Sequence, residues 1–132
     1  MKADKNETLQ EVYPDVKQMK PNNEGYDYLL MNVYGINLRI EFKSRVKTRK
    51  FDITAYQADH CDIFALKDEN EELWFMTNEL YMSLCEKHSA WPKHKSKRWQ
   101  LSLNKFRENS SKNLYEVADN FRPKYGTLHE FV

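Results

Sequence analysis

The chain has 132 residues and a formal net charge of +1, and 40% of its residues are hydrophobic. That length and hydrophobic content suffice for one packed core without disulfides, and no apolar run approaches the ~18 residues that a membrane span needs. We therefore expect a single domain over residues 1–132 without membrane contact. We also expect a cytoplasmic location, because residues 1–7 lack the apolar core of a signal peptide.

The N-terminal part of the chain predicts a helix and then a β-hairpin. Residues 5–20 are expected to form a helix that Pro14 ends, followed by an irregular connection. Strand patterns follow at residues 26–33 and 36–43. The short Tyr34-Gly35 connection between them favours an antiparallel hairpin.

The middle of the chain predicts a second group of strands. Residues 50–53 carry a weaker strand pattern, and residues 55–59 are expected to form a short helix or turn. The mostly apolar run 61–66 is typical of a buried central strand. After a turn at 68–71, residues 72–77 predict the next strand and so a second hairpin.

The C-terminal part predicts two helices around one more strand. A helix is expected from about residue 78 to residue 87, with Leu80 and Leu84 facing inward and Tyr81 as a further candidate. Alternation over 99–103 favours a short strand, and residues 110–121 show a helical apolar stripe. The whole order predicts an α/β fold with a mixed central β-sheet flanked by helices.

The first hairpin carries the residues with the clearest chemical potential. Side chains at i and i+2 of a strand share a face, so Glu41 and Lys43 project together, and pairing of the strands brings Asp27 beside Glu41. Two carboxylates offer oxygen ligands to Mg²⁺, and a neighbouring lysine can orient water or stabilise phosphate charge. This constellation suits metal-assisted phosphodiester hydrolysis. The competing interpretation is a solvent-facing Glu41–Lys43 ion pair of ~0–1 kcal/mol, with Asp27 accepting only a backbone hydrogen bond.

These residues resemble the PD-(D/E)xK nuclease superfamily, in particular small group I intron-associated homing endonucleases and Holliday junction resolvases. Tyr26-Asp27 stands where the family has Pro-Asp, and Glu41-Phe42-Lys43 stands where it has (Asp/Glu)-x-Lys. The tyrosine departs from the pattern but leaves the metal chemistry intact, because only the acid coordinates. The resemblance covers about residues 7–77.

The resemblance implies a restriction-endonuclease-like core and a metal-dependent endonuclease acting on DNA. Asp27 and Glu41 would bind Mg²⁺, with Mn²⁺ as a possible substitute, and Lys43 would orient water or stabilise the transition state. The family often adds an acid from the first helix, for which Glu7 and Glu11 both qualify and Glu11 is preferred. It also places a polar residue near the metal, where this chain has Gln57.

Basic side chains gather in two segments, one directly after the Glu-x-Lys strand and one between Glu86 and Glu108, where the sequence has no acid. If the fold brings both segments to one face, they could hold a polyanion. The other interpretation is that they only solvate loops. The candidate nucleic-acid contacts are Arg45, Lys47, Arg49, Lys50, Lys95, Lys97 and Arg98. A homodimer is a further hypothesis, since one active site cuts one strand.

Two other functions stay open on the sequence. One is a non-catalytic nucleic-acid-binding or adaptor protein with the same fold. The other is a protein–protein module that presents the acidic segment 59–72 to a basic partner. Cys61 and Cys85 form no CxxC pair and the histidines lack zinc-ligand spacing, so we expect buried free thiols.

Overall fold

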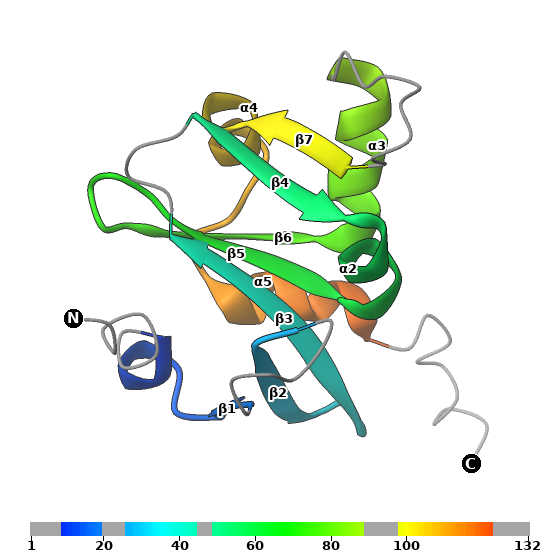
Figure 1. Ribbon diagram of the computed structural model, residues 1–132. Coiled ribbons are helices and arrows are strands. Elements are labelled where there is room, and N and C mark those ends of the chain that lie inside the picture. The colour runs from blue at the N-terminus through cyan, green and yellow to red at the C-terminus, as the bar shows by residue number, and fades with distance from the viewer. Residues whose placement is uncertain (1–8, 20–25, 45–48, 89–97, 123–132) are drawn as a thin grey trace.

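The computed structural model describes residues 9–19, 26–44, 49–88 and 98–122. The strands are β1 (Val16–Gln18), β2 (Tyr28–Val33), β3 (Ile36–Ser44), β4 (Lys50–Thr54), β5 (Ile63–Lys67), β6 (Leu73–Thr77) and β7 (Arg98–Ser102). The helices are α2 (Ala55–His60), α3 (Asn78–His88), α4 (Leu103–Glu108), α5 (Leu114–Ala118) and the 3₁₀ helix η1 (Asp119–Phe121), after a helical turn at 9–12. Figure 1 shows their arrangement.

The described strands form a five-stranded mixed sheet, in the order β1-β2-β3-β5-β6, and a two-stranded sheet of β4 and β7. β5 pairs in parallel with β3 and antiparallel with β6, and four of its five residues are buried. The predicted α/β fold with a mixed central sheet is confirmed, as is the position of β5 inside that sheet.

The β2–β3 hairpin closes through the two residues that the sequence predicts. Tyr34 and Gly35 have φ angles of 54° and 83°, so both lie in the left-handed region that a two-residue hairpin turn requires. The strands pair antiparallel, with Tyr28 opposite Ile40. This register decides which side chains meet at the far end of the hairpin.

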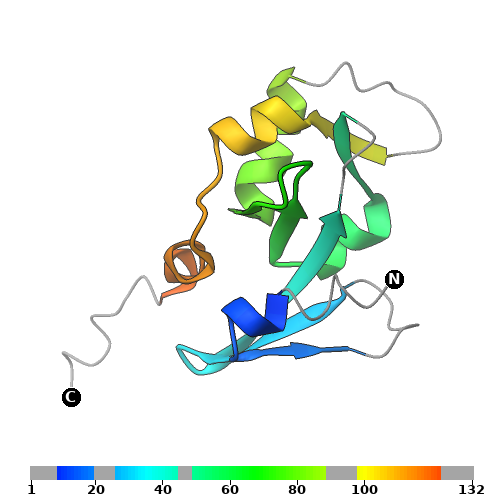
Figure 2. The same cartoon turned by 90° about the vertical axis from the view of Figure 1, so that its left-hand side faces the viewer.

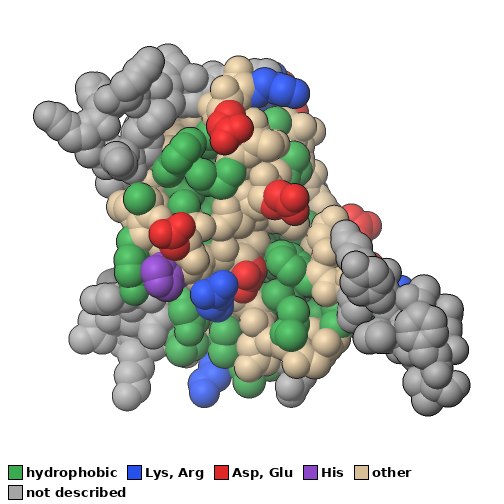
Figure 3. Space-filling model, turned by 90° about the vertical axis from the view of Figure 1, so that its right-hand side faces the viewer, with side chains coloured by type: hydrophobic (Ala, Val, Ile, Leu, Met, Phe, Trp, Pro, Cys, Tyr) green, Lys and Arg blue, Asp and Glu red, His purple; other side chains and the backbone are tan. Residues whose placement is uncertain are grey.

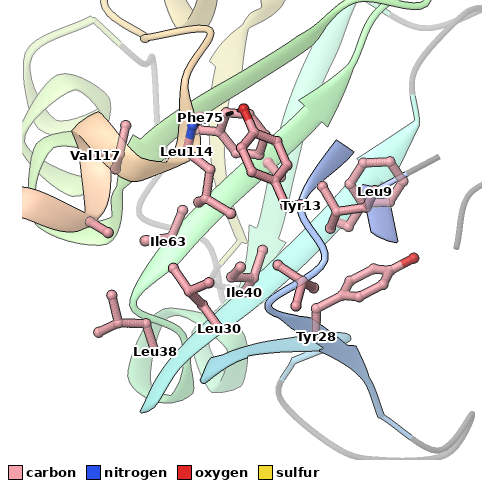
Figure 4. Packing of buried hydrophobic residues seen from close by; sticks show 14 residues of the cluster. Leu9, Tyr13, Tyr28, Leu30, Leu38, Ile40, Ile63, Phe75, Leu114 and Val117 are labelled. Atoms are coloured by element: carbon pink, nitrogen blue, oxygen red, sulfur yellow. Dashed lines mark hydrogen bonds between the residues drawn. The ribbon is translucent and has the colours of Figure 1, made fainter. Parts of the chain in front are cut away.

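The sheet has a hydrophobic core on each face. β5 shows the division: Ile63 and Ala65 join the core that includes Leu9 and Leu114, whereas Phe64 joins the core under α3 and the two-stranded sheet. Figure 4 shows the first core, with side chains from the hairpin, the first helical turn and α5 converging. Figures 1 and 2 show α5 and the β4–β7 ribbon on opposite sides of the sheet.

Two short elements differ from the sequence predictions. Where an irregular connection was expected, β1 pairs antiparallel with β2. Only Val16 of its three residues is buried, so the sequence shows no alternation of apolar and polar residues that would predict a strand. Where Leu103 was taken as the end of a strand, it begins α4, because Ser102 caps the helix by accepting from the Lys105 backbone N–H. A helix of six residues is too short to show a periodic pattern.

The predicted helices α3 and α5 exist, but their details differ. Leu84 and Tyr81 are buried, in agreement with the expectation, together with Cys85. Leu80 was expected to face inward but is 37% exposed. α5 is shorter than the predicted 110–121, because its hydrogen bonding tightens into η1 after Ala118.

Both cysteines are buried free thiols, as predicted. Burial raises the pKa of Cys85 to about 11, which keeps the thiol protonated at neutral pH. No helix within the described ranges is long and apolar enough to cross a membrane.

Candidate functional site

The two predicted acids meet at the open end of the β2–β3 hairpin. Asp27 lies one residue before β2, so the register that pairs Tyr28 with Ile40 places it opposite Glu41. The Asp27 N–H donates to the Ile40 carbonyl at 2.8 Å, and the Phe42 N–H donates to Asp27 Oδ2 at 3.0 Å. The Asp27 carboxylate therefore lies at the peptide that joins Glu41 to Phe42.

Glu41 is a buried carboxylate held by two donors. Its Oε2 lies 3.3 Å from Lys43 Nζ and accepts a hydrogen bond from Gln57 Nε2 at 3.0 Å. The Glu41 and Lys43 side chains are only 8% and 14% exposed, which contradicts the solvent-facing ion pair considered above. An unpaired carboxylate here would cost several kcal/mol, so the lysine and the amide stabilise the charge of Glu41.

Gln57 joins this site from α2, as the resemblance implies. Its Oε1 accepts the Thr54 N–H at 3.0 Å, while Thr54 Oγ1 accepts the Gln57 N–H at 3.1 Å. This reciprocal pair is a capping box at the N-terminus of α2. The sequence analysis missed Thr54, although the pattern Thr-x-x-Gln is a known signal for such a cap.

The pKa of the Cys61 thiol depends on the charges of the two acids, which was not predicted from the sequence. The thiol is buried directly after α2, and its pKa is raised by burial first, then by the negative charges of Glu41 and Asp27. A charge has this effect only at short range within a protein. The thiol therefore stays protonated at neutral pH.

The third acid of the resemblance is not part of this cluster as described. Glu11 is exposed on the helical turn 9–12, and among the described residues no hydrogen bond or ion pair joins it to Asp27 or Glu41. Glu7 lies outside the described residues. Within those residues there is no group of three or more His, Cys, Asp or Glu side chains that could hold a metal ion. Two carboxylates fit Mg²⁺, which keeps several waters and commonly uses one or two protein carboxylates.

The predicted basic segments are only partly described. Arg49 and Lys50 are exposed at the start of β4, and Arg98 begins β7. Since Lys50 pairs with Ser102 and Thr54 pairs with Arg98, the segments begin at opposite ends of one ribbon. The remaining candidates, which lie outside the described residues, are Arg45, Lys47, Lys95 and Lys97.

The acidic segment 59–72 is largely engaged inside the chain. Asp68 is 1% exposed and pairs with Arg107 at 3.0 Å, which removes this arginine from the second basic segment. Glu72 pairs with Lys112 at 3.0 Å. These contacts weaken the interpretation of the segment as a surface for a basic partner.

The face over the right-hand side of Figure 1 does not suit a polyanion. Figure 3 shows acidic side chains spread over this face, with few basic ones among the described atoms. A bound phosphate backbone would meet like charge there.

Comparison of the sequence with models of known protein families, and with curated proteins, gave no match.

Proposed function

We propose that this chain is a Mg²⁺-dependent DNA endonuclease of the PD-(D/E)xK type. The observation that supports it is the meeting of Asp27, Glu41 and Lys43 at one end of the hairpin, with Glu41 and Lys43 buried together. A buried ion pair is a weak source of stability, since apolar residues of the same volume often serve the fold equally well. A charged cluster of this composition is better explained by chemistry.

Each side chain then has a role. A Mg²⁺ ion held by Asp27 and Glu41 would lower the pKa of a bound water and neutralise charge on the phosphoryl oxygens. Lys43 lies 3.3 Å from Glu41 and would orient the attacking water or stabilise the charge that develops on the phosphate. Gln57 would hold Glu41 in place. Arg49 and Lys50 would contact the phosphate backbone beyond the cut.

The test is cleavage of supercoiled, linear and four-way-junction DNA with Mg²⁺, with Mn²⁺ and with chelator. We expect metal-dependent cleavage by the wild type. Glu41→Ala and Lys43→Ala should lose at least roughly 100-fold in rate while retaining DNA binding, because they remove the chemistry rather than the phosphate contacts.

A second ion pair in the chain supplies the matched control. Lys112 and Glu72 also form a Lys–Glu pair, at 3.0 Å, but their side chains are 58% and 49% exposed. Lys112→Ala and Glu72→Ala should cut DNA at the wild-type rate. Wild-type cleavage by Lys43→Ala or Glu41→Ala, or no cleavage by the wild type with either metal, would contradict the proposal.

One observation favours the non-catalytic nucleic-acid-binding alternative. The charge of Glu41 is already balanced by Lys43 and Gln57, so the fold does not need a metal ion at this point. Calorimetric titration with Mg²⁺ separates the two functions. A nuclease should bind Mg²⁺ and lose that binding in Asp27→Asn, whereas a purely structural cluster should show no binding in either protein.

A further inference from the structure

We propose that Thr54 is a positioning residue of this site, which orients Glu41 through the side chain of Gln57. The effect of Thr54 on Mg²⁺-dependent cleavage depends on the proposed function being correct. Its structural content, a relay from the cap of α2 to a site carboxylate, can be tested without any activity.

The relay consists of three consecutive hydrogen bonds. Thr54 Oγ1 accepts the Gln57 N–H at 3.1 Å, and the Thr54 N–H donates to Gln57 Oε1 at 3.0 Å. Because the amide oxygen is occupied in this way, the amide nitrogen points away from the cap. That nitrogen donates to Glu41 Oε2 at 3.0 Å. Gln57 thus contacts the cap with one end of its amide and the site with the other.

Both ends of α2 are fixed by side chains. Thr54 caps its N-terminus. At its C-terminal end, Asn78 Nδ2 donates to the Ala58 and Cys61 carbonyls at 2.7 and 2.8 Å. The helix has six residues and none of them is buried, so its position depends on its ends more than on packing.

Thr54 itself is firmly placed, since it ends β4 directly after Ile53, which is fully buried, and pairs with Arg98 of β7. The ribbon therefore fixes Thr54, and Thr54 fixes Gln57.

The alternative is that Thr54 only stabilises a short helix, as any N-cap does. Asn113 is a matched control, since its side chain caps the five-residue α5 by accepting the Tyr115 N–H at 2.9 Å. α5 packs against the core on the opposite face of the sheet from α2 and β4. Removing this cap should lower stability to a similar extent without changing Glu41.

The experiment compares Thr54→Val, Thr54→Ser and Asn113→Ala by NMR and by Mg²⁺ titration. In ¹⁵N-labelled protein, the side-chain NH₂ signals of Gln57 are assigned by their loss in Gln57→Glu. Thr54→Val keeps the backbone N–H that donates to Gln57 Oε1 but removes the Oγ1 acceptor of the Gln57 N–H, which loosens the first turn of α2. We therefore expect the Gln57 signals to move toward solvent-exposed values in Thr54→Val and to keep their wild-type positions in the other two variants. The Mg²⁺ concentration for half-maximal cleavage should rise about tenfold in Thr54→Val only.

The positioning role is wrong if Thr54→Val behaves like Asn113→Ala, with the Gln57 side-chain signals at their wild-type positions and an unchanged Mg²⁺ concentration for half-maximal cleavage. It is also wrong if Thr54→Ser, which keeps the hydroxyl, fails to restore them. Thr54→Ala repeats the comparison should the valine variant not fold. If the wild type neither binds Mg²⁺ nor cuts DNA, the proposed function fails, and the NMR comparison still decides the relay.

Discussion

At the scale of single residues, burial distinguishes Glu41 from the other acids that form ion pairs with lysine in the described part of the chain. The exposed pair of Lys112 and Glu72 has the same chemistry and a shorter distance, yet solvent screens it. Glu41 and Lys43 are nearly enclosed, so their charges interact more strongly with each other and with any ion or phosphate that approaches.

Gln57→Glu should tighten Mg²⁺ binding. Glutamate can keep the capping box by accepting the Thr54 N–H, but it replaces the donor to Glu41 with a second carboxylate. The two carboxylates repel each other without metal, and a divalent cation relieves that repulsion. We expect a Kd for Mg²⁺ several-fold lower than in the wild type, measured by calorimetry, and a melting temperature that rises more steeply with added Mg²⁺.

The control for this prediction is Gln10→Glu, an equivalent change outside the site. Gln10 donates to the backbone oxygen of Val16 and has no hydrogen bond to Asp27 or Glu41 among the described contacts. Its Mg²⁺ affinity should equal that of the wild type. Weaker Mg²⁺ binding by Gln57→Glu would show that the amide donor matters more than an added ligand.

At the scale of elements, the turn between β5 and β6 depends on Asp68. Its carboxylate accepts from the backbone N–H groups of Asn70 and Glu72, from the Trp74 indole and from Arg107. Burial acts to raise its pKa, but the donors outweigh burial and hold the pKa below its ordinary value. This one side chain connects the second hairpin to α4.

Asp68→Asn should lower the free energy of unfolding by roughly 2–3 kcal/mol at pH 7, because it removes charge-assisted hydrogen bonds. Because the pKa of Asp68 is lower in the folded state than its ordinary value of 3.8, the stabilisation is fully present above that pH and is lost as the pH falls through the folded-state pKa. Urea unfolding should therefore show a smaller difference from the wild type near pH 3 than at pH 7.

Glu69→Gln is the comparison for this prediction, because Glu69 contacts the same Arg107 from a side chain that is 46% exposed. It should change stability by less than about 1 kcal/mol. An Asp68→Asn variant as stable as Glu69→Gln at pH 7 would contradict the account of the turn.

At the scale of the whole molecule, the predicted DNA contacts that the structure describes include Arg49 and Lys50, which are exposed at the start of β4. Arg49→Ala and Lys50→Ala should each weaken binding to duplex DNA. Each lost phosphate contact should reduce the slope of log K against log salt by about 0.9. Fluorescence anisotropy between low and moderate salt measures both quantities. Lys112→Ala should leave the slope unchanged, and equal slopes for all four proteins would exclude these contacts.

The features that depend on the alternation of side chains between the two faces of a strand were predictable from the sequence. That alternation placed Glu41 and Lys43 on one face. The Tyr34-Gly35 turn predicted the hairpin, but its register alone would place Asp27 opposite Phe42. A register shift between Leu30 and Val33, which the sequence does not indicate, brings Asp27 opposite Glu41. The strand β1 and the helix α4 were not predicted, because three and six residues carry too little pattern.

Contacts across the fold were beyond sequence reasoning, because no local pattern specifies them. The effect of Glu41 and Asp27 on the pKa of Cys61 depends on where the fold places the residue that follows α2. The pairing of Arg107 with Asp68 joins residues far apart in the chain, and a charged residue in a basic stretch gives no sign of such a partner.

The central claim is that Asp27 and Glu41 bind one divalent cation, and crystals soaked in Mn²⁺ test it most directly. The account predicts an anomalous difference peak about 2 Å from oxygens of both carboxylates, with Asp27→Asn crystals lacking the peak. A Mn²⁺ peak elsewhere in the chain, or none between Asp27 and Glu41 in well-ordered crystals, would contradict the account.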